Sequence, residues 1–144
     1  MDDGFDYVDW THFEKTRGEL GGGFIRILGY FREDGAKSVA QIEAAMRDQN
    51  TVGLVIPAHT LKGEARQFGA DPLADCAELI EQSARISIET HSFPNELIAD
   101  VVKLRSLWNE TIALFDKATN PLLSRAATQG AFGRKAGNQS FGRL

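Results

Sequence analysis

The chain has 144 residues, 42% of them hydrophobic and 25% charged, a composition typical of a globular protein with one main domain. Its single cysteine, Cys76, excludes an internal disulfide, and its short apolar runs exclude a membrane-spanning helix. The net charge is −4, but residues 119–144 contain four cations and no acid, which leaves −8 on residues 1–118. Because such an acidic body disfavours nucleic acid, we expect neither a nucleic-acid nor a membrane partner. The acidic start lacks the basic region of a signal peptide, so we expect a cytoplasmic protein.

The N-terminal part of the chain predicts one short helix, over residues 9–18. Asp9 is placed to cap it, and Trp10 and Phe13 share one face. The triplet Gly21–Gly23 then interrupts the pattern. No strand precedes this triplet and no Gly-Lys-Ser/Thr sequence follows it, so we interpret it as a flexible turn and not as a phosphate-binding loop.

Apolar residues recur at steps of three and four over residues 24–34 and again over residues 36–48. Gly29 and Gly35 weaken the helical pattern, so this stretch predicts either two helices or one bent helix. A polar turn follows, in which Thr51 is a plausible N-cap for the next helix.

The next helix, around residues 58–70, carries the strongest pattern of the sequence. Its apolar stripe consists of Leu54, Ala58, Leu61, Ala65 and Phe68. At about 100° of rotation per residue, His59 points away from this stripe. Lys62, Gly63 and Arg66 fall on the same outward side, one and two turns further along.

This outward face has a chemical use. The imidazole of His59 is a good nucleophile near neutral pH, and Lys62 and Arg66 could supply positive charge to a phosphoryl group that it accepted. Gly63 removes a side chain where a partner would have to approach. Three apolar residues that fall on the outward side if they are helical predict a docking patch: Val52, Val55 and Ile56.

A second helix follows closely. Gly69 is placed to end the central helix in a left-handed cap, and Asp71–Pro72 has the acidic N-cap and first-turn proline of a new helix. Because the connection is short, the two helices should be antiparallel neighbours. This arrangement brings Glu81 to about the level of His59.

A final long helix is expected from Leu97 to Phe115, after an irregular stretch at residues 88–95. After Pro121 the helical pattern stops. The segment beyond it is rich in Gly, Ala, Ser and Arg and contains the sequence FGR twice, at residues 132–134 and 141–143, for which we have no interpretation.

No stretch alternates with a period of two, and helical patterns recur throughout. The sequence therefore predicts an all-α protein, an antiparallel four-helix bundle with a short additional N-terminal helix. Residues 1–118 would form the bundle, and residues 119–144 a basic C-terminal tail.

The stretch His59–Gly63, with the apolar and glycine positions that follow it, resembles the signature of histidine-containing phosphotransfer (HPt) domains. The positions that carry the likeness after Gly63 are Ala65, Phe68, Gly69 and Ala70. In helix lengths and apolar spacing the likeness extends from about Val8 to Ala118.

The resemblance implies a role for each site residue. His59 would be phosphorylated, Lys62 would neutralise the phosphoryl charge, and Gly63 would be kept clear for a receiver domain. Glu81 matches a Glu or Gln that many members of the family carry on the following helix. It would accept Nδ1–H of His59 and leave Nε2 as the nucleophile.

Two residues depart from the family pattern. Glu64 stands where Ser or Ala is usual and adds a negative charge within one turn of His59. Pro57 lies inside the expected helix and clashes with the carbonyl of Gly53. We therefore expect a kink near Gly53 or a helix that begins later than in the family.

The resemblance implies a phosphorelay intermediate that accepts a phosphoryl group from one receiver aspartate and passes it to another. Its partners would be response-regulator receiver domains and a hybrid sensor histidine kinase. The carrier itself would hold no cofactor, because Mg²⁺ belongs to the receiver, and it would be an inert monomer with no autonomous catalytic activity. The alternatives are a helical adaptor that binds a receiver or kinase without being phosphorylated, and a purely structural bundle.

Other chemistries have less support. The three histidines, His12, His59 and His91, lie in separate elements without a metal-binding spacing. Cys76 is better explained as a small core residue than as a nucleophile. The sequence leaves a Ser–His or Cys–His pair open, but it has no nucleophile elbow and no nucleotide-binding glycine loop.

Overall fold

The computed structural model describes residues 6–120, which form five α-helices and two short 3₁₀ turns and contain no strand. The α-helices are α1 (Trp10–Leu20), α2 (Phe24–Arg47), α3 (Val52–Gln67), α4 (Asp71–Glu89) and α5 (Ile98–Thr119). The 3₁₀ turns are Gly21–Gly23 and Asn95–Leu97. The expected all-α class is confirmed.

The chain divides into two compact units, Met1–Thr111 and Ile112–Leu144. In the second unit the structure describes the last turns of α5 up to Asn120, where the Thr119 hydroxyl donates to the Phe115 carbonyl at 2.9 Å. The expected boundary between residues 118 and 119 stays a prediction. The two FGR segments lie outside the described residues.

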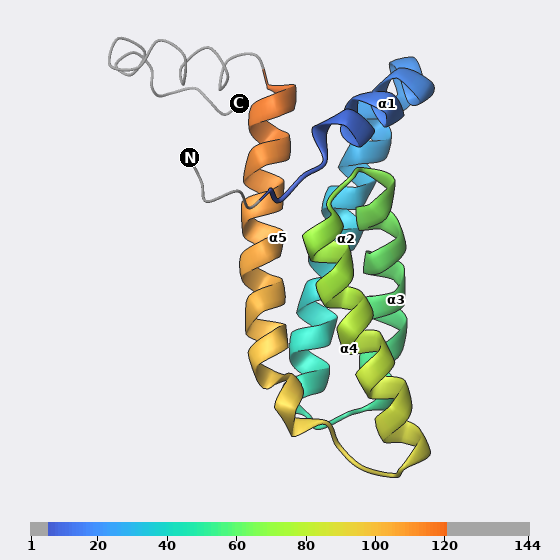
Figure 1. Cartoon of the computed structure of the whole chain (residues 1–144), viewed down its shortest axis with the longest axis vertical. Helices are drawn as coiled ribbons and strands as arrows, with labels where there is room; N and C mark the ends of the chain where they lie inside the picture. Colours follow the sequence, from blue (N-terminus) through green and yellow to red (C-terminus); the bar gives the residue numbers. More distant parts are fainter. Residues whose placement is uncertain (1–5, 121–144) are drawn as a thin grey trace, which may run out of the picture. The chain divides into compact units, whose positions relative to one another are not determined.

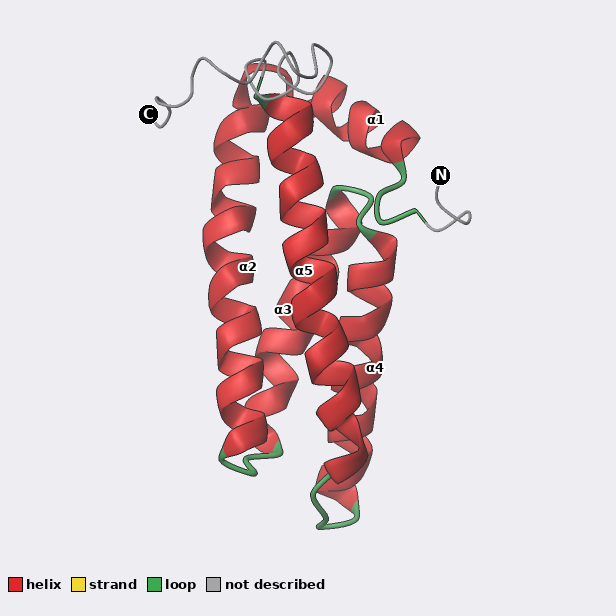
Figure 2. Cartoon of the chain, turned by 90° about the vertical axis from the view of Figure 1, so that its left-hand side faces the viewer, coloured by secondary structure: helices red, strands yellow, loops and turns green. Residues whose placement is uncertain are grey.

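In the first unit, α2, α3, α4 and the part of α5 up to Thr111 run alternately up and down beside one another (Figure 1). α1 crosses the end of this bundle where α2 begins and α3 ends (Figure 2). The short connections between α2, α3 and α4 make these helices antiparallel neighbours. The predicted four-helix bundle with an additional N-terminal helix is confirmed.

α3 lies between α2 and α4 and packs against both. The predicted stripe of α3 is fully buried, from Leu54 to Phe68. Burying such a stripe supplies most of the free energy that holds a helix in place, because helix propensity alone is marginal. The outward face of α3 is therefore held rigidly and presented to solvent.

α2 is one continuous helix of 24 residues, which excludes two separate helices in this stretch. Gly35 lies in its middle because a side chain there has no room. A Cβ atom on Gly35 would lie 2.3 Å from Cη2 of Trp108 on α5. The glycine thus admits the indole ring into the space between the two helices.

Aromatic rings fill the end of the bundle beneath α1. Their centroids lie 5.3–5.9 Å apart along a chain of neighbours, mostly with tilted or edge-to-face geometry. The rings in this chain are Phe13, Phe24, Phe68, Phe31 and Trp108. Offset contacts of this kind are favourable for aromatic pairs.

The α3–α4 turn receives α1. Gly69 has φ +79°, as its predicted left-handed cap requires, and its carbonyl accepts from the Asp9 amide at 2.8 Å. A Cβ atom on Gly69 would lie 2.7 Å from the Asp9 carbonyl oxygen. The predicted cap of α1 is also present, since the Asp9 carboxylate accepts from the His12 amide at 3.2 Å.

The predicted start of α3 needs a correction. The Thr51 side chain makes no cap hydrogen bond, and the Asn50 side chain accepts from the Gly53 amide at 3.0 Å instead. α3 begins at Val52, so Pro57 lies inside the helix and not ahead of its start. The kink near Gly53 stays a prediction. Pro57 lies in the second turn of α3, where it removes one backbone donor and leaves the rest of the helix intact.

Two smaller expectations also change. The residue before α4 is Ala70, and Asp71 is the first residue of the helix instead of its cap. The glycine triplet, interpreted from the sequence as a flexible turn, forms a short 3₁₀ turn. Within residues 6–120, no helix combines the length and hydropathy needed to cross a bilayer.

Candidate phosphoryl-transfer site

His59 lies on the exposed face of α3, as predicted. Its side chain is 57% exposed, while the neighbouring Ala58 and Leu61 are fully buried. The helical rotation between adjacent positions causes this contrast. The imidazole is therefore accessible to a partner, while the opposite face of α3 is buried and holds the helix in the bundle.

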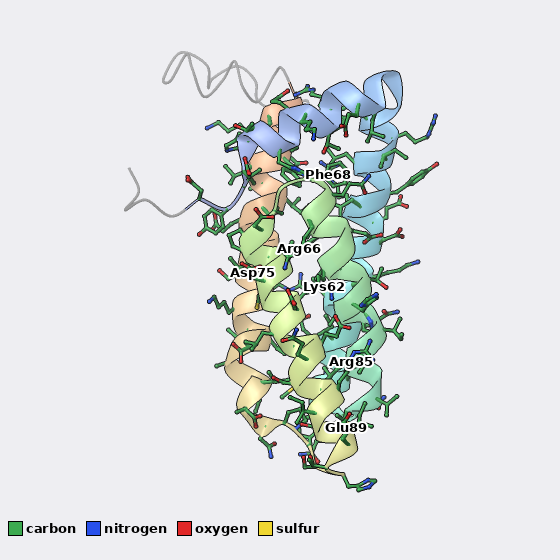
Figure 3. All side chains as sticks on the ribbon, turned by 45° about the vertical axis from the view of Figure 1, so that its right-hand side comes forward. Lys62, Arg66, Phe68, Asp75, Arg85 and Glu89 are labelled. Atoms are coloured by element: carbon green, nitrogen blue, oxygen red, sulfur yellow. The ribbon has the colours of Figure 1, made fainter. Side chains whose placement is uncertain are left out.

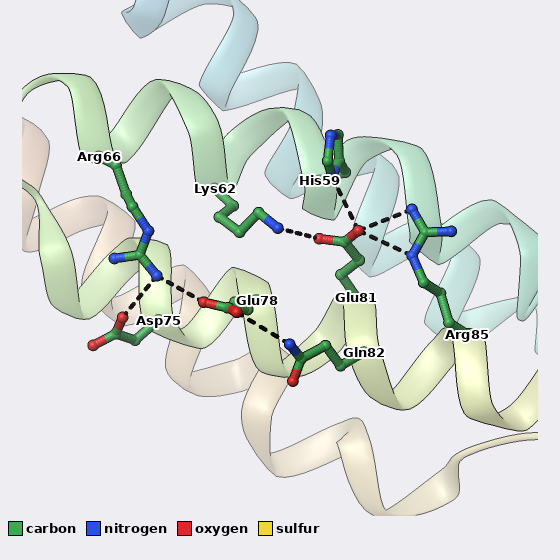
Figure 4. Close-up of polar contacts among 8 residues, drawn as sticks. All are labelled: His59, Lys62, Arg66, Asp75, Glu78, Glu81, Gln82 and Arg85. Carbon is green, nitrogen blue, oxygen red and sulfur yellow. Dashed lines mark hydrogen bonds and ion pairs between the residues drawn. The ribbon is translucent and has the colours of Figure 1, made fainter.

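Glu81 on α4 lies beside this imidazole, which confirms that the antiparallel packing brings the two residues together. His59 Nδ1 is 2.9 Å from Glu81 Oε2 (Figure 4). The Glu81 side chain is only 6% exposed, so the imidazole partly covers a buried carboxyl group.

Glu81 is held by two cations as well. Lys62 Nζ lies 2.9 Å from Oε1, and the Arg85 guanidinium contacts Oε2 through Nε at 3.0 Å and through a terminal nitrogen at 2.9 Å (Figure 4). Burial disfavours the charged carboxylate, but the contacts with Lys62, Arg85 and His59 outweigh it and lower the pKa of Glu81 to about 2. Glu81 is therefore a carboxylate at neutral pH.

This ionisation decides which nitrogen of His59 carries the proton. A carboxylate only accepts hydrogen bonds, so Nδ1 of His59 must donate to Glu81. In the neutral imidazole, Nε2 is then the nitrogen with a free lone pair. The contact with Glu81 thus selects, for the neutral ring, the tautomer that a nucleophile requires, with Nε2 on the side away from Glu81.

The surroundings of His59 are partly as expected. Gly63 is exposed, and a Cβ atom on it would meet nothing within 4 Å, so the protein's own packing does not require a glycine there. Val52 and Ile56 are 66% and 68% exposed, as a docking patch requires. Val55 is only 7% exposed, which corrects its placement in that patch. Since α3 packs against two helices, its buried arc is wider than one stripe and includes Val55.

Arg66 also needs a correction. Its guanidinium lies 3.0 Å from the Asp75 carboxylate and 2.7 Å from that of Glu78, both on α4. Figure 3 shows Lys62, Arg66 and Arg85 along the side where α3 and α4 meet, but only Lys62 and Arg85 reach Glu81. Arg66 therefore braces α3 against α4 instead of serving His59 as a second cation.

Glu64 does not face His59. It is half-buried, its Oε1 is enclosed without a hydrogen-bond partner among the described residues, and burial followed by repulsion from Asp34 on α2 raises its pKa. The extra negative charge thus lies on the α2 side of α3.

Arg85 was not among the site residues predicted from the sequence. A signal for it was present in the sequence, since Glu81 and Arg85 are four positions apart on one helix and such pairs of opposite charge face each other.

Cys76 is buried, and its thiol donates to the Asp100 carbonyl at 3.4 Å. Burial raises the pKa of the thiol to about 11, which suits a core residue. Residues 6–120 contain no cluster of three or more His, Cys, Asp or Glu side chains that could hold a metal ion.

A bundle of antiparallel helices that presents one oriented imidazole beside a lysine and a glycine is the architecture of a histidine phosphocarrier. The family model described as "Hpt domain" matches residues 26–112, more than half of the chain. The protein belongs to the HPt domain family, whose members are phosphocarriers that interact with receiver domains and kinases in phosphorelays.

A solved structure shows the same fold. The chain is similar to the crystal structure of histidine-containing phosphotransfer protein B (HptB) from Pseudomonas aeruginosa PAO1, with a TM-score of 0.67 and 21% sequence identity. The alignment covers 78% of this chain and 93% of that chain. The comparison with curated proteins found no significant match.

Proposed function

We propose that this protein is a phosphorelay intermediate. Nε2 of His59 accepts a phosphoryl group from the aspartyl phosphate of one receiver domain, which can belong to a hybrid sensor histidine kinase, and passes it to the aspartate of another. The observation that supports this most directly is the 2.9 Å contact between His59 Nδ1 and the buried Glu81 carboxylate, because it leaves Nε2 as an exposed nucleophile.

The transfer step exchanges one bond for another. The lone pair of Nε2 forms the N–P bond while the P–O bond to the aspartate breaks, and the aspartate carboxylate leaves with the electron pair. Nδ1 keeps its proton, so the phosphorylated ring becomes an imidazolium. Glu81, 2.9 Å from Nδ1, stabilises the positive charge that develops on this ring.

The phosphoryl group also needs positive charge, and Lys62 is the cation proposed to supply it. Its ammonium lies on the same helix one turn from His59 and already reaches the Glu81 carboxylate beside the ring. A lysine suits this role because its flexible stem lets the charge move. Mg²⁺ and the acidic pocket would belong to the receiver, so the carrier alone would have no autonomous catalytic activity. We also expect the carrier to be a monomer. The cytoplasmic location stays a prediction.

The test uses an autophosphorylating sensor kinase, its receiver domain and labelled ATP, mixed with this protein. We expect acid-labile, alkali-stable label on wild-type protein and none on His59→Gln. Circular dichroism and receiver binding should be almost unchanged in the variant, since the His59 side chain is largely exposed.

Two results would contradict the proposal. Label that persists in His59→Gln would show that another residue is the acceptor. Absence of label with several receivers, together with measurable binding to one of them, would favour the adaptor alternative.

A further inference from the structure

Glu81 is shared between two cations that occupy different positions. Lys62 approaches Oε1 from α3, and Arg85 approaches Oε2 from the same helix as Glu81, one turn further on. We propose that Arg85 is a positioning residue: it keeps Glu81 paired when Lys62 leaves Glu81 for the phosphoryl group on His59. This inference rests on the proposed function.

Lys62 is already paired before a phosphoryl group arrives. In the free protein its ammonium lies 2.9 Å from Glu81 Oε1. To neutralise a phosphoryl group on Nε2 it must turn toward the side of the ring away from Glu81. The charge that compensates the phosphoryl group is therefore engaged elsewhere until phosphorylation occurs.

Burial makes Glu81 depend on a cation. The Glu81 side chain is 6% exposed, and a buried carboxylate left without a cation is strongly destabilised. If Lys62 were its only cation before the ring becomes an imidazolium, Glu81 would hold Lys62 back from the arriving phosphoryl group. Arg85 removes this conflict, because its two contacts are with Oε2 and are independent of Lys62.

Arg85 binds the Glu81 oxygen that faces His59. Oε2 is the same atom that accepts from His59 Nδ1. Arg85 therefore holds this oxygen toward the imidazole while Oε1 exchanges partners. The planar guanidinium suits this task, since its donors have a fixed geometry and it stays charged.

The experiment compares Arg85→Gln in two backgrounds, wild type and Glu81→Gln. The control is Arg105→Gln, because Arg105 also contacts one carboxylate through two nitrogens, at 2.8 and 2.9 Å. Its partner is Glu43, so this pair joins α5 to α2, and neither helix contributes a residue to the site. Transfer from a phosphorylated receiver and the lifetime of the phosphohistidine are measured for each protein. Circular dichroism checks that each variant is folded.

With Glu81 present, Arg85→Gln should slow transfer about tenfold, the effect typical of losing one charge-assisted contact. Arg85→Lys should restore part of the rate. With Gln at position 81 there is no carboxylate to hold Lys62 back, so adding Arg85→Gln should change little. Arg105→Gln should leave transfer unchanged.

A second readout needs no phosphorylation. In Arg85→Gln, Lys62 is the only lysine or arginine on Glu81, so its ammonium protons should exchange with water more slowly than in the wild type, as measured by ¹⁵N NMR. If wild-type protein takes no label, the proposed function fails, and this measurement alone tests the competition between Lys62 and Arg85.

Two results would overturn the inference. An equal loss of transfer in both backgrounds would mean that Arg85 acts directly on the phosphoryl group or on the partner. Unchanged transfer and unchanged Lys62 exchange in Arg85→Gln would mean that Arg85 does not influence the availability of Lys62.

Discussion

Glu81 is the residue whose ionisation holds the site together. Its pKa is lowered to about 2 because the contacts with Lys62, Arg85 and His59 outweigh its burial. A carboxyl group whose pKa is lower in the folded than in the unfolded state stabilises the fold when the pH is above its unfolded-state pKa. This contribution disappears as the pH falls through its folded-state pKa.

A pH series of Glu81→Gln tests this ionisation. Near pH 7 the variant should have a lower free energy of unfolding, by about 2–3 kcal/mol. The difference from wild type should shrink as the pH falls from about 4.5 toward about 2, between the ordinary and the shifted pKa of Glu81. Urea unfolding at several pH values measures it. A difference that did not vary with pH would show that the ionised carboxylate is not responsible.

Glu64 has the opposite character, because nothing among the described residues donates to its buried oxygen. Burial, followed by repulsion from Asp34, raises the pKa of Glu64, so the folded state binds this proton more tightly than the unfolded state. Its contribution is therefore most favourable at low pH and is lost as the pH rises.

We expect Glu64→Gln to raise the free energy of unfolding at pH 7 by about 0.5–1 kcal/mol, since a neutral amide is less costly to bury. The advantage should vanish at pH 4, because a carboxyl whose pKa is raised above its ordinary value is already protonated there. Thermal unfolding at both pH values decides. A destabilised variant at pH 7 would indicate a favourable interaction of the carboxylate instead.

At the scale of elements, α2 contains two glycines with different reasons to be there. Gly35 faces Trp108, and a Cβ atom would lie 2.3 Å from its ring, whereas a Cβ atom on Gly29 would meet nothing within 4 Å. One glycine is thus required by packing between helices, and the other only lowers the propensity of the helix.

Alanine at the two positions should have opposite effects. Gly35→Ala should destabilise the protein by about 1–3 kcal/mol, because the indole ring must move. Gly29→Ala, the matched control in the same helix, should stabilise it by about 0.5–1 kcal/mol. Chemical denaturation measures both. If Gly35→Ala also stabilised the fold, the explanation that the Trp108 ring leaves no room for a side chain at position 35 would be contradicted.

For the whole molecule, the arrangement of exposed apolar residues bears on partner choice. Val52 and Ile56 lie on α3 within two turns of His59, and both are more than 60% exposed. Val102 on α5 is exposed to the same degree, at 67%, but belongs to a helix that contributes no residue to the site. Substitutions at the two locations can therefore show whether a partner binds the apolar residues beside His59 or any exposed apolar residue.

We expect Ile56→Asp to weaken binding of a receiver domain about tenfold or more, because it places a charge in the proposed contact. Val102→Asp, the control, should bind normally. Both variants should unfold at nearly the wild-type denaturant concentration, since neither side chain is buried. Titration calorimetry with one receiver compares them, and an equal loss in both would remove α3 as the specific docking face.

Local patterns in the sequence were sufficient for the helices and for the direction of His59. The apolar steps of three and four place Leu54 to Phe68 on one side of α3, and helical rotation alone then directs His59 outward. Gly69 could likewise be identified as a left-handed cap, because its role depends on its own backbone.

The contacts between helices could not be predicted from the sequence and became known only from the tertiary structure. The partners of Arg66, the burial of Val55 and the closeness of Gly35 to Trp108 all follow from which faces of two helices meet, a relation that periodicity within one helix does not contain. The same applies to Arg85. Its spacing from Glu81 was visible, but its importance arises because packing buries the Glu81 carboxylate between α3 and α4.

The sequence by itself thus determined that an all-α bundle presents His59 with Lys62 and Gly63 on an exposed helix face, since each of these features is set within a few turns of one helix. Only the tertiary structure decided that Glu81 is buried and charged, that Lys62 and Arg85 share it, and that Arg66 is engaged elsewhere. The physical reason is that burial and charge pairing are properties of the space between helices, where desolvation and opposing charges are brought together by folding.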